Sequence, residues 1–182
     1  MHTTPVDILQ FWFSEEVKPL WFNSTPEFDA QLKERYADIY HEALNGQLAK
    51  WQLTAEGCVA LVVILDQFPL NMYRGLPESF AGEAKARDIT REAVRKRFDQ
   101  QIPDEQKAFL YMPLMHSENI ADQDLSVQLF EAAGLTENLR FANHHRDIVR
   151  RFGRFPHRNK ILGRTSTQAE LDYLTSKDAF HG

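Results

Sequence analysis

The sequence predicts an all-α protein of about seven to eight antiparallel helices, for three reasons. Apolar residues recur at the three- to four-residue spacing of a helix along most of the 182-residue chain. Pairs that are typical of helix starts, such as Thr4-Pro5 and Thr25-Pro26, precede several of these stretches. No segment of convincing length alternates polar and apolar residues in the way that a half-buried strand does.

Three helices are expected in the first part of the chain. The second of them carries apolar residues at helical spacing and should end at Asn45-Gly46. The third is nearly all apolar through Cys58–Leu65, so we expect it to be the most buried helix and to end at Pro69. The residues expected to cap these helices are, in order, Thr4, Thr25 and Thr54.

Five further helices are expected after a loop at Gly75 and Pro77. They are a charged helix through Phe98, one from Pro103-Asp104 that Pro113 stops or kinks, one capped by Ser117 or Asn119, one from Thr136 to near Gly153, and a short one after Ser166-Thr167. In the charged helix the candidate buried residues are Phe80, Ala84, Ile89, Val94 and Phe98. In the helix from Thr136 they are Phe141, His145, Ile148, Val149 and Phe152.

Length and composition indicate one globular domain over residues 1–182. Hydrophobic residues make up 43% of the chain and aromatic residues 12%, which supports a sizeable core and argues against disorder. The N-terminus lacks the basic start of a secretory signal, and the longest apolar run, Cys58–Leu65, is too short to span a bilayer. The single cysteine, Cys58, lies in that run, as a reduced core residue would. We therefore expect a cytoplasmic protein without a membrane partner.

Charge is concentrated in the segment Arg140–Arg164, which contains seven arginines and one lysine but a single acid, Asp147. The whole chain has 21 basic and 26 acidic residues, so removing the eight basic residues and one acid of this segment leaves 13 basic and 25 acidic. The segment therefore requires anionic partners, either acids elsewhere in the fold or a ligand. The acidic remainder makes nucleic acid an unlikely partner.

A first polar cluster, LDQFPLNMYRG, spans residues 65–75. Asp66 is expected at a helix C-terminus, where a carboxylate opposes the helix dipole and needs a compensating donor. We favour a structural salt bridge to an arginine of another cluster over a ligand-binding role. Gln67 and Asn71 are also candidates for a structural or a ligand-binding role, because their side-chain amides can form hydrogen bonds with backbone groups of the loop.

A second polar cluster, YMPLMHSEN, spans residues 111–119. His116 is a candidate general base and Glu118 a candidate acid or base. A histidine at a helix junction is more often a partly buried residue that is hydrogen-bonded to backbone, and Glu118 also suits the first turn of the following helix. His-x-Glu is a weak metal signal without a paired ligand four residues away, so no metal is expected.

The third polar cluster is the irregular turn RFPHRN after Gly153, together with the helix before it. Guanidinium groups bind carboxylates and phosphates bidentately, so these residues suit an anion. The candidate ligand-binding residues here are His145, Arg151, Arg154, His157, Arg158 and Asn159. The structural alternative is that Arg151, Arg154 and Arg158 pair with Asp66, Glu118 and similar acids and hold the loops together. We expect at least one contact between Asp66 or Glu118 and one of these arginines.

These blocks resemble those of a bacterial domain-of-unknown-function family, the one numbered 924. The similar segments are LDQFPLNMYRG, FLYMPLMHSEN with the following ADQ, and RFGRFPHRNKILGR with TSTQAELDYL. The family block usually reads DQFPRN, so Leu70 stands where an arginine is expected, with Arg74 as a possible replacement. The resemblance implies stacked helical hairpins similar to tetratricopeptide-like proteins, and no settled activity.

Two functions follow from these observations. The first is a pocket lined by His116, Arg154, His157 and Arg158 that binds an anionic small molecule, with or without proton transfer. Asp66, Glu118 and Asp147 are fewer than the seven arginines, so some guanidinium is expected to remain available to a ligand. The alternative is a helical-hairpin module that binds an acidic peptide or protein. No phosphate loop or dinucleotide fingerprint occurs, so no cofactor is expected.

Overall fold

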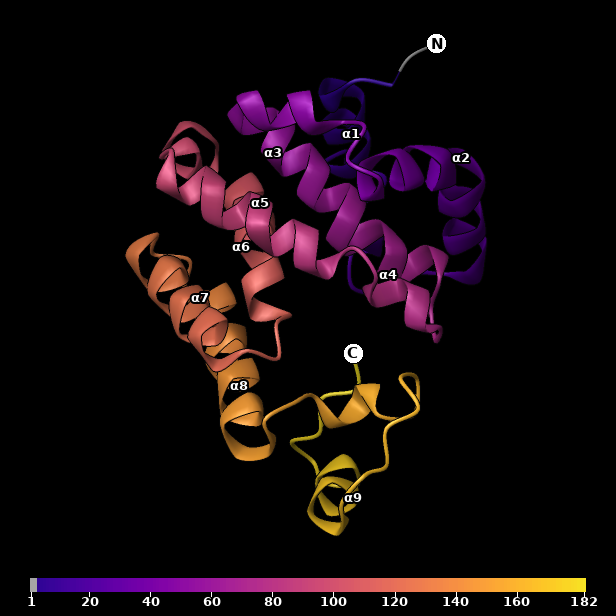
Figure 1. Cartoon of the computed structure of the whole chain (residues 1–182), viewed down its shortest axis with the longest axis vertical. Helices are drawn as coiled ribbons and strands as arrows, with labels where there is room; N and C mark the ends of the chain where they lie inside the picture. Colours follow the sequence, from indigo (N-terminus) through magenta and orange to yellow (C-terminus); the bar gives the residue numbers. More distant parts are fainter. Residues whose placement is uncertain (1–2) are drawn as a thin grey trace. The chain divides into compact units, whose positions relative to one another are not determined.

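The protein is all-α in a computed structural model that describes residues 3–182 (Figure 1). Its α-helices are α1 (Pro5–Trp12), α2 (Pro26–Leu44), α3 (Ala55–Val62), α4 (Phe68–Met72), α5 (Glu83–Arg95), α6 (Asp104–Met115), α7 (Ile120–Ala132), α8 (Thr136–Phe152) and α9 (Gln168–Leu174). A π turn, Val63–Gln67, joins α3 and α4 into one continuous helix. Counted in this way, residues 3–182 form eight helices and no strand, which confirms the predicted fold class.

The chain divides into two compact units. Unit 1 contains the described residues up to Arg74 together with Glu78–Pro113, and unit 2 contains Gly75–Pro77 and Leu114–Gly182. One domain over residues 1–182 stays a prediction, because compact units of this size occur both within one domain and as separate domains. Likeness to tetratricopeptide proteins also stays a prediction.

The helix starts are set by local side-chain hydrogen bonds. Thr4 and Thr167 form capping boxes at α1 and α9, because each threonine accepts from a backbone N–H three residues later. Threonines also cap α2 and α3, and Asn119 caps α7. The predicted caps at Thr4, Thr25 and Thr54 are therefore confirmed.

The core of unit 1 is built around the helix Ala55–Met72. Residues Val59–Leu65 are at most 2% exposed, and α1, α2 and α5 pack against this helix. The prediction that Cys58–Leu65 forms the most buried helix is confirmed. By length and composition Ala55–Met72 could cross a membrane, but 89% of it is buried inside the protein, as in an ordinary core helix.

The prediction that this helix ends at Pro69 is wrong. In the π turn the Phe68 N–H donates to the Val63 carbonyl, five residues back, instead of four. This wider turn lies directly before Pro69, which then occupies the first turn of α4, where its missing N–H is not needed. The helix therefore continues to Met72.

The buried face predicted for the charged helix is also wrong in part. The helix α5 begins only at Glu83, and its buried apolar face is formed by Ala86, Ile89 and Ala93, while Ala84 is exposed. The start is set by Gly82, where an added Cβ would lie 2.3 Å from the Leu65 carbonyl oxygen. Only a residue without a side chain allows this close approach to the core helix.

Unit 2 contains the paired helices α7 and α8, which lie side by side (Figure 1), and the shorter α9. The predicted buried residues His145, Ile148 and Val149 of α8 are confirmed. Phe141 is 47% exposed instead, with the Arg140 guanidinium 4.8 Å above its ring. A cation over the face of an aromatic ring interacts favourably with it and partly covers a ring that is not buried in the core.

Candidate functional site

The first polar cluster lies in unit 1, and its members have contacts within that unit. Asp66 and Gln67 are buried in the π turn, where the Gln67 amide donates to Asp66 Oδ2 at 2.6 Å. Asn71 Nδ2 donates to Asp29 Oδ1 at 2.7 Å, and Arg74 Nε donates to Asp29 Oδ2 at 2.8 Å. Asn71 and Arg74 therefore fix the first turn of α2. The pairing of Asp66 with the arginine segment stays a prediction.

In unit 2, Glu118 is the acceptor of a bidentate ion pair with Arg164. Arg164 Nη1 and Nη2 donate to the two carboxylate oxygens at 2.8 Å each, and the Phe155 backbone N–H donates to Oε1 at 2.8 Å. Burial raises the pKa of Glu118, but these hydrogen bonds outweigh it and leave the pKa below its usual value. Glu118 is therefore ionised at neutral pH and already bound, which favours a structural role over acid–base work.

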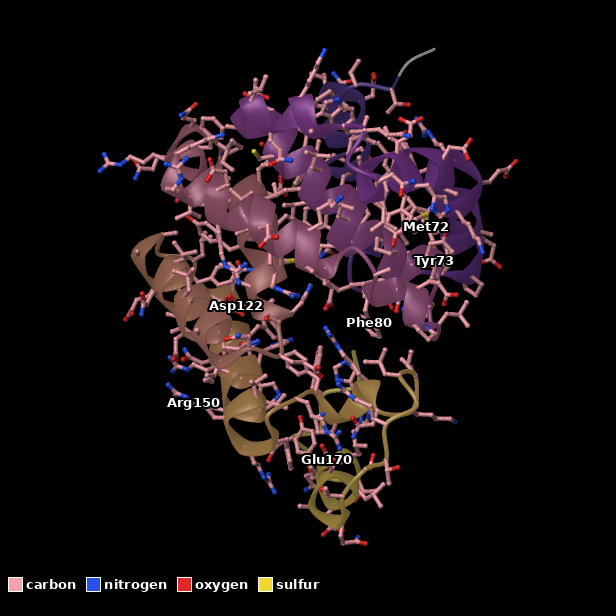
Figure 2. The ribbon with its side chains drawn as sticks, in the orientation of Figure 1. Met72, Tyr73, Phe80, Asp122, Arg150 and Glu170 are labelled. Atoms are coloured by element: carbon pink, nitrogen blue, oxygen red, sulfur yellow. The ribbon has the colours of Figure 1, made fainter. Side chains whose placement is uncertain are left out.

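A second bidentate pair joins Arg154 to Glu170 in the first turn of α9. Arg154 Nε and Nη2 donate to the two Glu170 oxygens at 2.7 and 2.9 Å, and Nη2 also donates to the Thr165 carbonyl. Glu170, labelled in Figure 2, is 2% exposed and also accepts from the Thr167 N–H. The bonds from Arg154 lower the pKa of Glu170 to about 2.

Asn159 connects the two pairs. Its Oδ1 accepts from Arg164 Nε at 2.9 Å, and its Nδ2 donates to Glu170 Oε2 at 3.2 Å and to Ser166 Oγ at 3.1 Å. Asn159 is 1% exposed, so bulk water does not compete for the hydrogen bonds of its amide. We call the chain Glu118–Arg164–Asn159–Glu170–Arg154 the ion-pair network.

The Nε and Nη2 atoms of Arg154 are engaged by Glu170, and a ligand-binding role for Arg154 stays a prediction. The comparison of the number of acids with the number of arginines was wrong, because acids outside the counted set pair with the segment. Those acids, with their partners, are Glu137 for Arg140, Asp124 for Arg146 and Arg150, and Glu170 for Arg154. Arg151 stacks instead on the rings of Phe152 and Tyr173, at 4.7 and 5.9 Å.

The second feature of unit 2 is a buried histidine, His145, on the inner face of α8. It is 3% exposed, and its Nδ1 lies 2.8 Å from the Phe141 carbonyl oxygen. A carbonyl only accepts, so Nδ1 carries the proton and Nε2 is left as an acceptor. Nε2 is buried and has no hydrogen-bond partner. Burial lowers the pKa of His145 to about 3, so the ring is neutral at pH 7.

Aromatic rings and a second histidine ring surround His145. The Phe180 ring lies 4.5 Å and the Phe155 ring 5.6 Å from the imidazole, and the His116 ring lies 6.4 Å away. His157 also contacts Phe180, at 4.9 Å, and burial lowers its pKa to about 3. The group of His116, His145, His157, Phe155 and Phe180 is called the histidine cluster.

Arg158 brings a positive charge to the edge of the histidine cluster. It is 6% exposed, its guanidinium carbon lies 5.0 Å from the Phe155 ring centroid, and Nη2 donates to the His116 carbonyl at 2.9 Å. The loop that contains His116 is fixed in turn by Gln123, whose amide donates to the Met115 and Ser117 carbonyls. The structure thus brings together three of the four predicted pocket residues, His116, His157 and Arg158.

Sequence reasoning missed Arg164, Glu170 and Phe180 as members of these clusters. A signal existed for Glu170, because Thr167 followed three residues later by an acid is a capping box. No such local signal marks the pairing of Arg164 with Glu118 or of Phe180 with His145, because these partners lie far apart in sequence. Across residues 3–182, no group of three or more His, Cys, Asp or Glu side chains is arranged to hold a metal ion.

Comparisons with known proteins agree with this fold. A family model described as "Bacterial protein of unknown function (DUF924)" matches residues 8–178. The chain is also similar to the solved structure of a protein of unknown function, ATU0120 from Agrobacterium tumefaciens, with a TM-score of 0.89 and 38% sequence identity. That match covers 94% of this chain and 96% of the other. No curated protein matches this chain.

Proposed function

The chain belongs to the DUF924 family of bacterial proteins of unknown function, and for it we propose a small-molecule site in the histidine cluster of unit 2. The ligand class is a small anion, a phosphate or carboxylate, that also carries a hydroxyl group. Arg158 would bind the anionic group, and His145 would accept the hydroxyl proton in a hydrogen bond.

The observation that carries this proposal is the Nε2 atom of His145. A buried polar atom without a partner is unfavourable, and native proteins rarely keep one without a reason. The Nδ1 bond to Phe141 fixes the tautomer, so Nε2 is prepared to accept from a ligand. Its pKa of about 3 favours a hydrogen-bond acceptor over a general base, which works best with a pKa near the operating pH.

Arg158 supports the anionic part of the ligand. Its side chain is buried and is held by the His116 carbonyl and the Phe155 ring, so the guanidinium is already oriented. Arg154 and Arg164 bind Glu170 and Glu118, so the ion-pair network holds in place the segment that contains Arg158.

Access to His145 Nε2 requires a neighbouring side chain to move, because the atom is fully buried. Phe180 is the best candidate, since its ring is the nearest to His145, at 4.5 Å, and it is only partly buried. It lies outside every helix, and its backbone N–H is held by the Tyr173 hydroxyl. A rotation of one ring would therefore open the site without unfolding a helix.

The test is a calorimetric titration of the full chain with two phosphates, glycerol 3-phosphate and inorganic phosphate. We expect glycerol 3-phosphate to bind at least about tenfold more tightly, because its alcohol hydroxyls are separate from the phosphate and can donate to Nε2 while the phosphate lies on Arg158. His145→Phe should abolish that preference, while the matched control His144→Phe should keep it. Equal affinities for the two phosphates in the wild type, or an unchanged preference in His145→Phe, would overturn the proposal.

The same comparison with lactate and propionate covers the carboxylates. If neither hydroxylated anion shows saturable binding, the proposed class of ligand is wrong. The alternative of an acidic peptide stays a prediction. Of the exposed arginines of α8, Arg140 and Arg150 each contact an acid of this chain, and Arg151 stacks on the Phe152 and Tyr173 rings, so no particular contact favours it.

A further inference from the structure

Unit 1 contains a pocket of about 430 Å³ between the end of α1 and the first two turns of α2. Its lining residues from α2 are Phe28, Gln31, Leu32, Glu34 and Arg35, and Phe11 lines it from α1. Three of them, Phe28, Leu32 and Arg35, are spaced so that they share one face of α2. The volume lies within the range of small-molecule sites, roughly 300–1,000 Å³.

Phe11, Phe28 and Leu32 give this pocket one apolar side. Phe28 is 8% and Leu32 1% exposed, and the Phe11 and Phe28 rings lie nearly parallel, with centroids 6.3 Å apart. Phe11 also contacts Tyr36 at 4.9 Å and Phe68 at 6.3 Å, so the pocket wall is continuous with the aromatic core of the unit. Such a wall suits a hydrocarbon chain or ring.

One cation lies beside this wall. The Arg35 guanidinium carbon is 5.0 Å from the Phe11 ring centroid and 4.9 Å from that of Tyr36. In the part of the chain that the structure describes, Arg35 makes these two ring contacts and forms no ion pair, since the nearby Asp7 carboxylate is engaged by Thr4. Arginine on aromatic rings keeps its in-plane N–H groups available for a bidentate carboxylate.

A second observation concerns Tyr36, which is not one of the residues that line the pocket but contacts two of them, Phe11 and Arg35. The Tyr36 hydroxyl is buried and has no hydrogen-bond partner, and its residue is 3% exposed. Burial raises the pKa of Tyr36 to about 12, although the charge of Arg35 acts in the opposite direction, so the group is a neutral O–H donor close to Arg35. A buried donor of this kind lacks an acceptor that a carboxylate would supply.

We propose that this pocket binds a free amphipathic carboxylate, with its apolar body against Phe11, Phe28 and Leu32 and its carboxylate on Arg35 and the Tyr36 hydroxyl. Glu34 at the rim disfavours a second negative charge, so the ligand carries a single carboxylate. The site is independent of the histidine cluster, since every residue that forms it belongs to unit 1.

The experiment uses the full chain and two probes, octanoate and octan-1-ol, which share the apolar body and differ in charge. Binding is followed by calorimetry and by tryptophan fluorescence, because Trp12 contacts Phe68 next to the pocket. We expect saturable octanoate binding that is at least about tenfold tighter than octanol binding, since a hydrogen bond to a charged group is worth that much.

Arg35→Gln should reduce octanoate affinity at least about tenfold and leave octanol affinity unchanged. The matched control is Lys33→Gln, an exposed α2 residue whose ammonium lies over the Tyr73 ring instead. Tyr36→Phe removes only the hydroxyl and should also weaken octanoate. Equal binding of octanoate and octanol, or an Arg35→Gln variant with wild-type octanoate affinity, would overturn the proposal. His145→Phe should not affect octanoate, which separates this test from that of the histidine cluster.

Discussion

Replacement of Glu118 by glutamine tests the ion-pair network directly. Glu118 accepts two hydrogen bonds from Arg164 and one from the Phe155 N–H, all at 2.8 Å. Glutamine keeps the shape but turns an NH₂ group toward Arg164, so at least one charge-assisted bond is lost. A hydrogen bond to a charged group contributes about 1.5–3 kcal/mol. Because the two side chains remain 26% and 23% exposed, we expect a loss near the lower end, about 2 kcal/mol.

This loss should depend on pH. The folded protein holds the pKa of Glu118 below its ordinary value of 4.5, so the unfolded chain takes up the proton first as the pH falls. The stabilisation is therefore complete above pH 4.5 and disappears as the pH falls through the lower pKa of the folded state. The difference in unfolding free energy between wild type and Glu118→Gln should be about 2 kcal/mol at pH 7 and should shrink below pH 4.5.

Urea unfolding followed by circular dichroism at pH 7 and at pH 4 measures both quantities. The matched control is Glu137→Gln, whose pair with Arg140 is exposed and should contribute less than about 0.5 kcal/mol. A Glu118→Gln variant as stable as this control at pH 7 would refute the reasoning. A destabilisation that does not change with pH would show that the carboxylate charge is not its source.

Two further outcomes follow from the fold. Gly82→Ala should lower stability by about 1–3 kcal/mol, because its Cβ would meet the Leu65 carbonyl at 2.3 Å; a thermal melt that matches wild type would contradict this contact. His145→Phe should flatten the loss of stability on acidification. The pKa of His145 is about 3 in the folded protein and 6.5 in the unfolded chain, so the wild type loses stability as the pH falls from 6.5 toward 3. Phenylalanine takes up no proton, so the variant lacks this loss. Equal slopes of unfolding free energy against pH in the two proteins would contradict the prediction.

Much of the fold could be predicted from the sequence because its signals are local. Thr4, Thr54 and Thr167 cap helices through bonds to residues only three positions away. The continuation of the helix past Pro69 could not be predicted, because no local sequence pattern marks the π turn that accommodates the proline. The buried face of α5 could not be predicted for a different reason, because Gly82 lies against Leu65 of another helix.

The candidate site was predictable in its residue types and only partly in its pairings. His145, Arg158 and Asn159 belong to blocks that the sequence singles out, and all three are buried in unit 2. Their partners are separated by many residues, as Glu118 is from Arg164, and spacing alone cannot identify such pairs. The sequence therefore indicates which side chains are unusual, while the structure shows which of them bind each other.

The π turn at Val63–Gln67 is equivalent to one extra residue inside a continuous helix. Each residue of an α-helix turns the chain by about 100°, so the insertion rotates everything after the turn relative to α3. The side chains of Asn71 and Met72 consequently point in different directions from those that they would have in a regular α-helix of the same sequence. A chain that lost one residue here would keep its helix and its hydrophobic character, yet Asn71 would turn away from Asp29. Alignment of related sequences across this helix therefore needs a single-residue gap wherever the π turn is absent, although no loop is present to accommodate one.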